Sequence, residues 1–229
     1  MKLIIAGATG FVGTEVVRQA LLHPAVTSVV ALGRRATPVP ANIGPDANVS
    51  KLKSTICDDF ENYSESVKAD LAGADALRAM PFEQVEKICL DYTANGLKTM
   101  AAMSNKPFRF IYTSGAKTNR DPTVRPWIMP DYGVLRSRVE NHVLDFAKQP
   151  DGKDVQVCIT RPGLIYAPGH MSTLTVVAST IMRNLIGLPR VELDEIAATM
   201  VDQAVNGIEK ETLLNEDLVR IGRKLLTSS

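Results

Sequence analysis

Short apolar runs alternate with helical patterns along the first 160 residues of the chain. The runs at residues 3–6, 29–32, 108–112 and 155–159 are nearly continuous, which is typical of strands buried on both faces of a parallel sheet. Between them, apolar residues recur at helical spacing over residues 12–21, 82–104 and 135–147. The pattern predicts an α/β protein with a doubly wound, mostly parallel sheet and helices on both faces.

The expected central strand of this sheet has the weakest signal. In a doubly wound sheet the fourth strand lies beside the first, where it should be a near-continuous apolar run. The stretch at residues 74–80 has Arg78 in its middle and Pro81 directly after it. We therefore expect the fourth strand to be weak or missing. As a hypothesis, a segment of roughly 7–12 residues has been lost near residues 76–78.

The remaining stretches complete the expected organisation. Residues 51–57 suit a third, edge-side strand, and residues 64–71 suit a short helix. Beyond the sixth strand we expect helices at residues 173–186 and 194–207, followed by a short tail. Residues 1–170 would then form a dinucleotide-binding Rossmann domain. Residues 171–229 would be a small helical extension of the same domain on the substrate side.

A glycine-rich turn follows the first strand and opens the first helix. Gly7 would let the chain leave the strand tightly, and Gly10 would let the backbone approach a pyrophosphate without an intervening Cβ. Gly13 would let helix and strand pack closely, while free N–H groups at the helix start face the anion. The alternative is an ordinary turn that needs glycines. The expected cofactor contacts of this turn are Gly7, Thr9, Gly10, Phe11, Val12 and Gly13.

Two later strand ends carry further cofactor candidates. Arg34 and Arg35 follow the second strand, about 20 residues beyond the glycine turn, where a dinucleotide fold reads the ribose. Because guanidinium groups match a 2′-phosphate, they predict NADP rather than NAD; the alternative is a solvated pair. Asp59 and Phe60 follow the third strand and are candidates for the adenine. They could equally be a capping aspartate and a packing phenylalanine.

Composition and charge exclude several classes of function. The 229 residues include 26 basic and 25 acidic ones, a formal net charge of +1, so there is no electrostatic case for nucleic acid or an anionic membrane. Neither the three histidines nor the three cysteines have a metal-binding spacing. No secretory signal and no integral membrane segment is expected. We therefore expect a reducing compartment and a cytoplasmic protein.

With these motifs placed, the sequence resembles the short-chain dehydrogenase/reductase superfamily. It looks most like the atypical, Tat-interacting-protein-like branch of its NAD(P)-binding oxidoreductases. The resemblance covers about residues 1–170, apart from the irregular centre. It is carried by the glycine turn, Arg34-Arg35, residues 112–116, residues 131–136 and Arg161-Pro162-Gly163.

The resemblance implies a set of catalytic residues. Ser114 would hydrogen-bond the substrate oxygen, and Tyr132 would donate or accept the proton. Arg136 stands where the family usually has a lysine, and its bulk and fork geometry differ from those of lysine. Pro162 and Gly163 would shape the nicotinamide pocket, or merely form a strand-ending turn. In the alternative without catalysis, Arg136 pairs with Glu140 one helical turn later and Tyr132 packs.

The sequence thus predicts an NADP-dependent oxidoreductase that transfers a hydride between nicotinamide and a small or medium organic carbonyl or alcohol. The main alternative is a non-catalytic NADP-binding regulatory or sensor protein, which Arg136 in the lysine position favours. A third alternative is a damaged, non-functional isoform. The partner would be a small-molecule substrate, and the helix at residues 82–104 leaves open a two-fold interface in a homodimer.

Overall fold

The computed structural model describes residues 1–72, 76–79, 87–121, 123–125, 130–167 and 187–227. Seven parallel strands form one sheet in the order β3-β2-β1-β4-β5-β6-β9, and β7 and β8 form a second, two-stranded sheet. The strand order reverses between β1 and β4, as expected for a doubly wound Rossmann fold.

The bounds of the strands agree with the predicted apolar runs. The expected strands are β1 (Lys2–Ala6), β2 (Ser28–Gly33), β3 (Leu52–Ile56), β5 (Phe108–Thr113) and β6 (Val155–Arg161). The shorter ones are β4 (Ala76–Ala79), β7 (Leu164–Tyr166), β8 (Arg190–Glu192) and β9 (Thr212–Leu214).

The weak fourth strand is present. Over four residues, β4 pairs with β1 on one side and with β5 on the other, so that Arg78 lies opposite Ile5 and Ile111. The alternative of a missing strand is therefore wrong, because the central position of the sheet is filled. Pairing on both sides compensates for the polar residue that weakened the sequence signal, since strand propensity yields to tertiary context.

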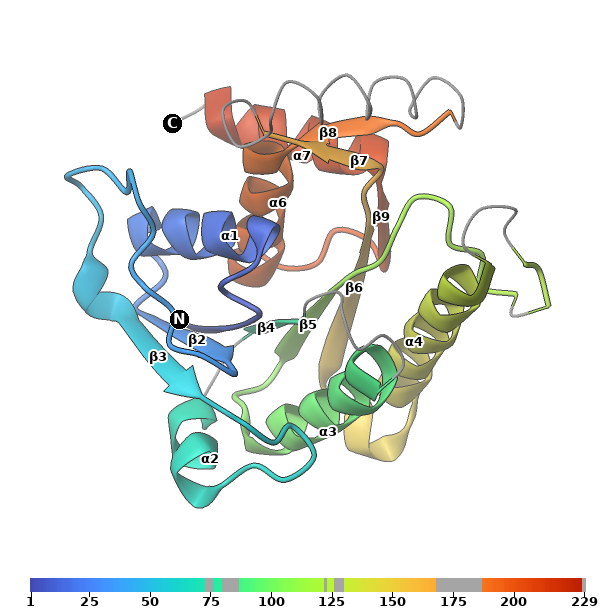
Figure 1. Ribbon diagram of the computed structural model, residues 1–229, viewed down its shortest axis with the longest axis horizontal. Helices are drawn as coiled ribbons and strands as arrows, with labels where there is room; N and C mark the ends of the chain where they lie inside the picture. Colours follow the sequence, from blue (N-terminus) through green and yellow to red (C-terminus); the bar gives the residue numbers. More distant parts are fainter. Residues whose placement is uncertain (73–75, 80–86, 122, 126–129, 168–186, 228–229) are drawn as a thin grey trace.

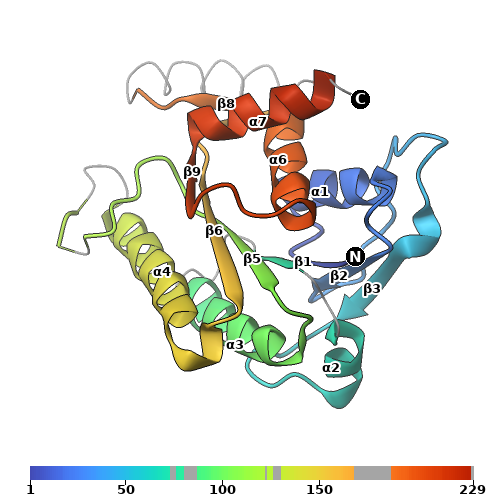
Figure 2. The same cartoon turned by 180° about the vertical axis from the view of Figure 1, so that it is seen from behind.

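Helices cover both faces of the sheet (Figures 1 and 2). One face carries α1 (Phe11–Leu22), α6 (Leu193–Val205) and α7 (Asn215–Thr227), and the other carries α2 (Glu65–Leu71), α3 (Thr93–Met103) and α4 (Pro130–Lys148). Short helical turns lie at Val49–Lys51 and Pro150–Gly152. The helix expected at residues 82–104 is described as a π-helical turn, Lys87–Tyr92, followed by α3.

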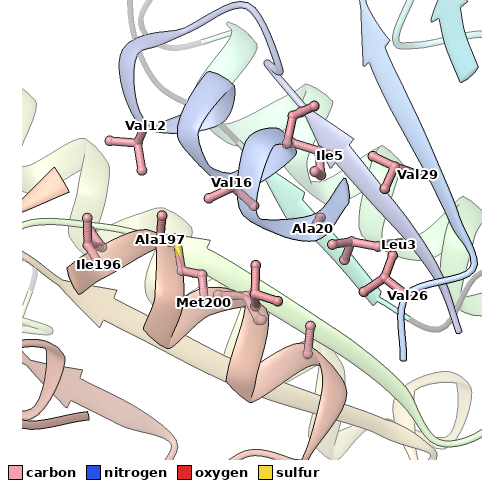
Figure 3. Close-up of a cluster of buried hydrophobic side chains, with 14 of the residues drawn as sticks. Leu3, Ile5, Val12, Val16, Ala20, Val26, Val29, Ile196, Ala197 and Met200 are labelled. Carbon is pink, nitrogen blue, oxygen red and sulfur yellow. The ribbon is translucent and has the colours of Figure 1, made fainter. Parts of the chain in front are cut away.

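Alternating side chains of each strand divide the interior into two cores. Leu3 and Ile5 of β1 belong to the core beneath α1 and α6, whereas Ile4 between them belongs to the core beneath α3 and α4. Figure 3 shows the first of these cores, where Val16 of α1 and Met200 of α6 lie beside the strands. Burial on both faces explains why the strands are continuous apolar runs rather than alternating ones.

The C-terminal part contains more regular structure than the sequence suggested. The predicted helix at residues 194–207 is α6, whereas the helix expected at residues 173–186 lies outside the described residues. The expected short tail instead provides β9, which pairs with β6, and α7, which packs on α6. Within the described residues, no helix is both long enough and apolar enough to cross a membrane.

Candidate cofactor-binding and active site

The glycine turn joins β1 to α1 through a short hydrogen-bonded loop. Gly7 has a φ of 71°, in the left-handed region that favours glycine. Its N–H donates to the carbonyl of Leu32 on β2 at 3.1 Å, and its own carbonyl accepts from the N–H of Gly10 at 3.0 Å. The chain therefore leaves the strand at the position where the sequence required a residue without a Cβ.

The start of α1 approaches this turn more closely than a side chain would allow. A Cβ built on Gly13 would lie 2.2 Å from the carbonyl oxygen of Gly7. Gly10 caps the helix without any side-chain hydrogen bond. The helix N-terminus, with its partial positive charge, is thus free of a competing side-chain acceptor and suits an anion such as a pyrophosphate. Thr9 and Phe11 are exposed at the turn, and Val12 is buried.

Apart from Tyr132 and Arg136, which lie in α4, the predicted site segments follow the carboxyl ends of strands. Arg34 and Arg35 come directly after β2, and both side chains are exposed. Ser114 comes directly after β5, and Pro162 directly after β6. Because these strands are parallel, their carboxyl ends lie along the same edge of the sheet as the glycine turn, where doubly wound folds bind ligands.

The segment after β3 contains the two adenine candidates. The ring of Phe60 stacks on that of Tyr92, with centroids 5.4 Å apart, and meets the edge of Tyr63 at 6.1 Å. The carboxylate of Asp59 accepts from the N–H of Glu61 at 2.8 Å, as in a local turn. These contacts support packing and turn-forming roles, and adenine binding by the two residues stays a prediction.

Ser114 is held in a buried turn at the end of β5. Its side chain is 2% exposed, and its Oγ shares a hydrogen bond of 3.1 Å with Thr118 Oγ1. Its backbone N–H donates to the carbonyl of Thr160 on β6 at 2.8 Å. The hydroxyl therefore has a fixed position, with a second hydroxyl available to orient its proton.

Arg136 links the helix that carries Tyr132 to this turn. The guanidinium carbon lies 4.5 Å from the centroid of the Tyr132 ring, a distance at which a cation–π attraction operates. A Cβ on Gly115, the neighbour of Ser114, would lie 2.8 Å from Arg136 Nη1. Among the described residues, the buried Arg136 Nε has no hydrogen-bond partner. The Arg136 guanidinium thus lies against both the Tyr132 ring and the turn that contains Ser114.

The ion pair between Arg136 and Glu140, which the alternative without catalysis required, is not formed. The Glu140 side chain is fully buried, and it accepts from Arg161 Nε at 3.0 Å and Nη2 at 2.5 Å. It also accepts from Arg120 Nε at 3.3 Å. A buried carboxylate requires such partners, and they turn it towards β6 and the loop after β5 rather than along the helix. The pairing connects α4 to both strand ends of the candidate site.

Pro162 and Gly163 are tied to the neighbouring loops. The carbonyl of Pro162 accepts from the N–H of Ala116 at 2.9 Å, and the N–H of Gly163 donates to Asn215 Oδ1 at 2.9 Å. Asn215 is 6% exposed and also donates from Nδ2 to the carbonyl of Arg190 at 2.9 Å. This segment is therefore fixed from two sides, which agrees with either a pocket wall or a strand-ending turn.

The roles that Thr118, Asn215 and Glu140 have in this arrangement were missed by the sequence analysis. Thr118 lies in a loop without a periodic signal, whereas Asn215 opens α7, where Leu218 and Ile221 recur at helical spacing. The burial of Glu140 could have been predicted from the sequence, because Glu140 adjoins the apolar stripe of α4 that contains Val139 and Val143. An acid beside such a stripe must find a cationic partner if it is buried, and Arg161 of the Arg-Pro-Gly segment is that partner.

The cysteines and histidines form no further site within the described residues. Cys57 and Cys158 are buried free thiols, and burial raises the pKa of Cys158 to about 12. Among the described residues no three His, Cys, Asp or Glu side chains gather in a way that could hold a metal ion. One of the three histidines, His170, lies outside these residues.

Comparisons with known proteins identify relatives of the chain. Residues 3–198 match the model of the NAD-dependent epimerase/dehydratase family. The curated protein "Protein FMP52, mitochondrial" of Candida albicans (strain SC5314) is 31% identical over 173 residues, which cover 63% of this chain and 72% of that protein.

Solved structures share the fold at low sequence identity. Vestitone reductase from alfalfa (Medicago sativa) has a TM-score of 0.68 and 21% identity, over 93% of this chain and 76% of that chain. Gre2 from Candida albicans, solved in complex with NADPH, has a TM-score of 0.65 and 18% identity, over 93% of this chain and 77% of that chain.

Proposed function

The chain belongs to the NAD-dependent epimerase/dehydratase family, and we propose that it is an NADP-dependent oxidoreductase acting on a carbonyl or alcohol group. The family and the fold of its structural neighbours agree with the resemblance to the short-chain dehydrogenase/reductase superfamily. The proposed substrate is a small or medium-sized organic compound. The observation that carries this proposal is Arg136, which contacts the Tyr132 ring and reaches the turn that holds Ser114.

The glycine turn fits the dinucleotide that the family implies. The left-handed Gly7 and the uncapped start of α1 leave backbone N–H groups free to face a pyrophosphate. Because Gly13 has no side chain, the helix backbone can approach Gly7 closely, and no side chain of Gly13 projects into the turn. Thr9, Phe11 and Val12 would contribute through the same segment, and Pro162 and Gly163 would border the nicotinamide.

Arg34 and Arg35 would set the preference for NADP. Both side chains are exposed at the end of β2, so they can reach a 2′-phosphate without breaking a buried interaction. Each charge-assisted hydrogen bond contributes about 1.5–3 kcal/mol, so we expect roughly tenfold or stronger binding of NADPH than of NADH. Gre2, a structural neighbour, was solved with NADPH.

Bound nicotinamide would supply or accept the hydride. Tyr132 would give a proton to the substrate oxygen or take one from it, while Ser114 donates a hydrogen bond to the same oxygen. A free tyrosine has a pKa near 10, so this role needs a nearby cation. Arg136, whose guanidinium carbon lies 4.5 Å from the centroid of the Tyr132 ring, would be that cation, and its N–H groups would also donate to a ribose hydroxyl.

The alternative is an NADP-binding regulatory protein without turnover. It is favoured by the arginine at position 136, which cannot release its proton as a lysine can. In this alternative the glycine turn and Arg34-Arg35 keep their roles, and only the proton transfer by Tyr132 is absent. Turnover with bound cofactor therefore separates the two functions.

The proposal is tested by titrating the full chain with NADPH and NADH while following cofactor fluorescence. We expect NADPH to bind at least about tenfold more tightly than NADH, and we expect the double variant Arg34→Ala/Arg35→Ala to lose this preference while it still binds NADH. Equal binding of the two cofactors by the unaltered chain would refute the NADP assignment. A folded chain that binds neither cofactor would refute the proposed function.

Location, domain roles and assembly complete the proposal. The name of the Candida albicans relative assigns that protein to mitochondria, whereas the sequence of this chain favours the cytoplasm. Fractionation of cells that express the untagged chain decides between the two compartments.

We also propose that residues 171–229 supply the substrate side of the site. Sedimentation of the purified chain tests the homodimer.

A further inference from the structure

An open pocket of about 550 Å³ adjoins the turn that holds Ser114. Its wall is formed by the loop after β5, the end of β6 and the start of β9. The lining residues are Ala116, Lys117, Thr118, Asn119, Arg120, Arg161 and Thr212. Thr118 connects the pocket to the candidate active site, because its hydroxyl lies 3.1 Å from that of Ser114. A pocket of this size accommodates a small organic molecule.

Among the described residues, the lining is cationic and contains no acidic residue. Lys117, Arg120 and Arg161 contribute three positive charges. Glu140, behind the wall, is shared by the two guanidinium groups, and Glu211 pairs with Arg120 from a side chain that is 55% exposed. Lys117 is exposed, and no carboxylate pairs with it among the described residues. The three cations and the two carboxylates, Glu140 and Glu211, therefore leave a net charge of +1 at the pocket.

The neutral part of the lining also favours an anion. Thr118, Asn119 and Thr212 add hydroxyl and amide groups that can donate hydrogen bonds. Charge-assisted bonds to a carboxylate or phosphate are the strong ones among protein hydrogen bonds. Because the excess is a single positive charge, a carboxylate matches it better than a phosphate ester, which carries about −1.5 to −2 at neutral pH.

We propose that this pocket binds a carboxylate carried by the substrate, so that the reacting compound is a small keto acid or hydroxy acid. This inference rests on the proposed function, because the pocket is assigned to substrate through Thr118, which lines it and shares a hydrogen bond with Ser114. Buried Glu140 holds Arg120 and Arg161 in place beforehand, which lowers the cost of ordering them around an anion. Lys117 adds the charge that no acid within the described residues neutralises.

The test compares matched ligands by ligand-observed NMR on the full chain. The probes are 4-oxopentanoate, its uncharged methyl ester and inorganic phosphate, each measured with and without NADP⁺, which cannot reduce the keto group. We expect the acid to bind about tenfold more tightly than the ester, and phosphate to compete poorly. Equal binding of acid and ester, no binding of the acid at millimolar concentration, or stronger binding of phosphate would overturn the proposal.

Two charge reversals locate the binding site. Lys117→Glu should weaken 4-oxopentanoate about tenfold and leave the ester unchanged. Lys153→Glu, at an exposed position between α4 and β6, should change neither. An equal effect of both variants would show that only overall charge matters and would overturn the pocket assignment. If the chain does not bind NADPH but still prefers the acid to the ester, the proposed function is refuted, whereas the assignment of the pocket to a carboxylate is retained.

Discussion

Two regions of the candidate site are built by opposite means. At the start of α1, the turn between Gly7 and Gly13 is shaped by backbone atoms that approach because side chains are absent. Where β5, β6 and α4 meet, the geometry comes from long charged side chains around the buried Glu140. The first region depends on excluded volume, and the second on the balance of buried charges.

This difference predicts how each region responds to substitution. The shape of the glycine turn depends on the missing Cβ of Gly13 and not on a charged partner. The turn should therefore tolerate substitutions elsewhere in the chain, but not an added Cβ at position 13. A buried ion-pair cluster tolerates small changes in shape but not the loss of one charge, because the remaining charges stay desolvated. Binding of cofactor and transfer of the proton should therefore be separable by mutation.

Replacing the tyrosine that contacts Arg136 should have the largest effect. Tyr132→Phe removes only the proton carrier, so turnover should fall by about 10²-fold or more, while NADPH affinity should stay within about twofold. Steady-state kinetics and cofactor fluorescence measure the two quantities. Retained turnover would defeat the catalytic assignment of Tyr132, and a large loss of cofactor affinity would break the separation between the two regions.

Glu140→Gln should cause the largest loss of stability. It leaves Arg161 and Arg120 without their shared carboxylate, and we expect a loss of about 3 kcal/mol in the free energy of unfolding, at the lower end for buried pairs because both arginines keep some solvent contact. Urea unfolding followed by circular dichroism measures it. The control Glu216→Gln, at an exposed position in the first turn of α7, should change stability by less than about 0.5 kcal/mol. Similar losses for the two variants would refute the role of the cluster.

Gly13→Ala tests the region built by excluded volume. The added Cβ would lie 2.2 Å from a backbone oxygen, so the helix must shift, at a cost of about 1–3 kcal/mol in the free energy of unfolding, and NADPH binding should weaken. In the control Gly33→Ala, the nearest atom to the new Cβ is a carbonyl oxygen at an ordinary 3.5 Å, and stability should be nearly unchanged. A stable Gly13→Ala variant with normal cofactor affinity would contradict the assigned geometry.

Gly115→Ala should have the smallest effect on stability and sharpens the comparison within the second region. The atom nearest to the new Cβ is Nη1 at the end of the flexible Arg136 side chain, at 2.8 Å, which can move aside, and Thr118 Oγ1 lies at an ordinary 3.9 Å. We expect unfolding to change by less than about 0.5 kcal/mol, whereas turnover falls several-fold because the guanidinium leaves its position by Ser114. An unchanged kcat would argue against a role for Arg136 in positioning.

The sequence predicted most of the sheet because each strand is buried on both faces. The runs around Ile4, Val30 and Phe110 need no partner to be read as strands. In the tail, β9 was missed because it covers only Thr212–Leu214, too few residues for any periodicity, whereas α7 has apolar residues at helical spacing that the sequence analysis did not use. The strand β4 was doubted because of Arg78, and its pairing with β1 and β5 is a tertiary effect.

The candidate site also contains one part that the sequence predicted and one part that only the fold determined. The glycine turn was predictable from the sequence because Gly7, Gly10 and Gly13, whose close approach shapes it, lie within seven consecutive residues, and a missing Cβ is visible in the sequence itself. The partner of Glu140 was not readable, because Arg120 and Arg161 stand 20 and 21 residues away from it on different elements. Any of 26 basic side chains could have neutralised that carboxylate. Only the packing of α4 against the sheet decided which two did, since a buried charge takes the cations that the fold brings within reach.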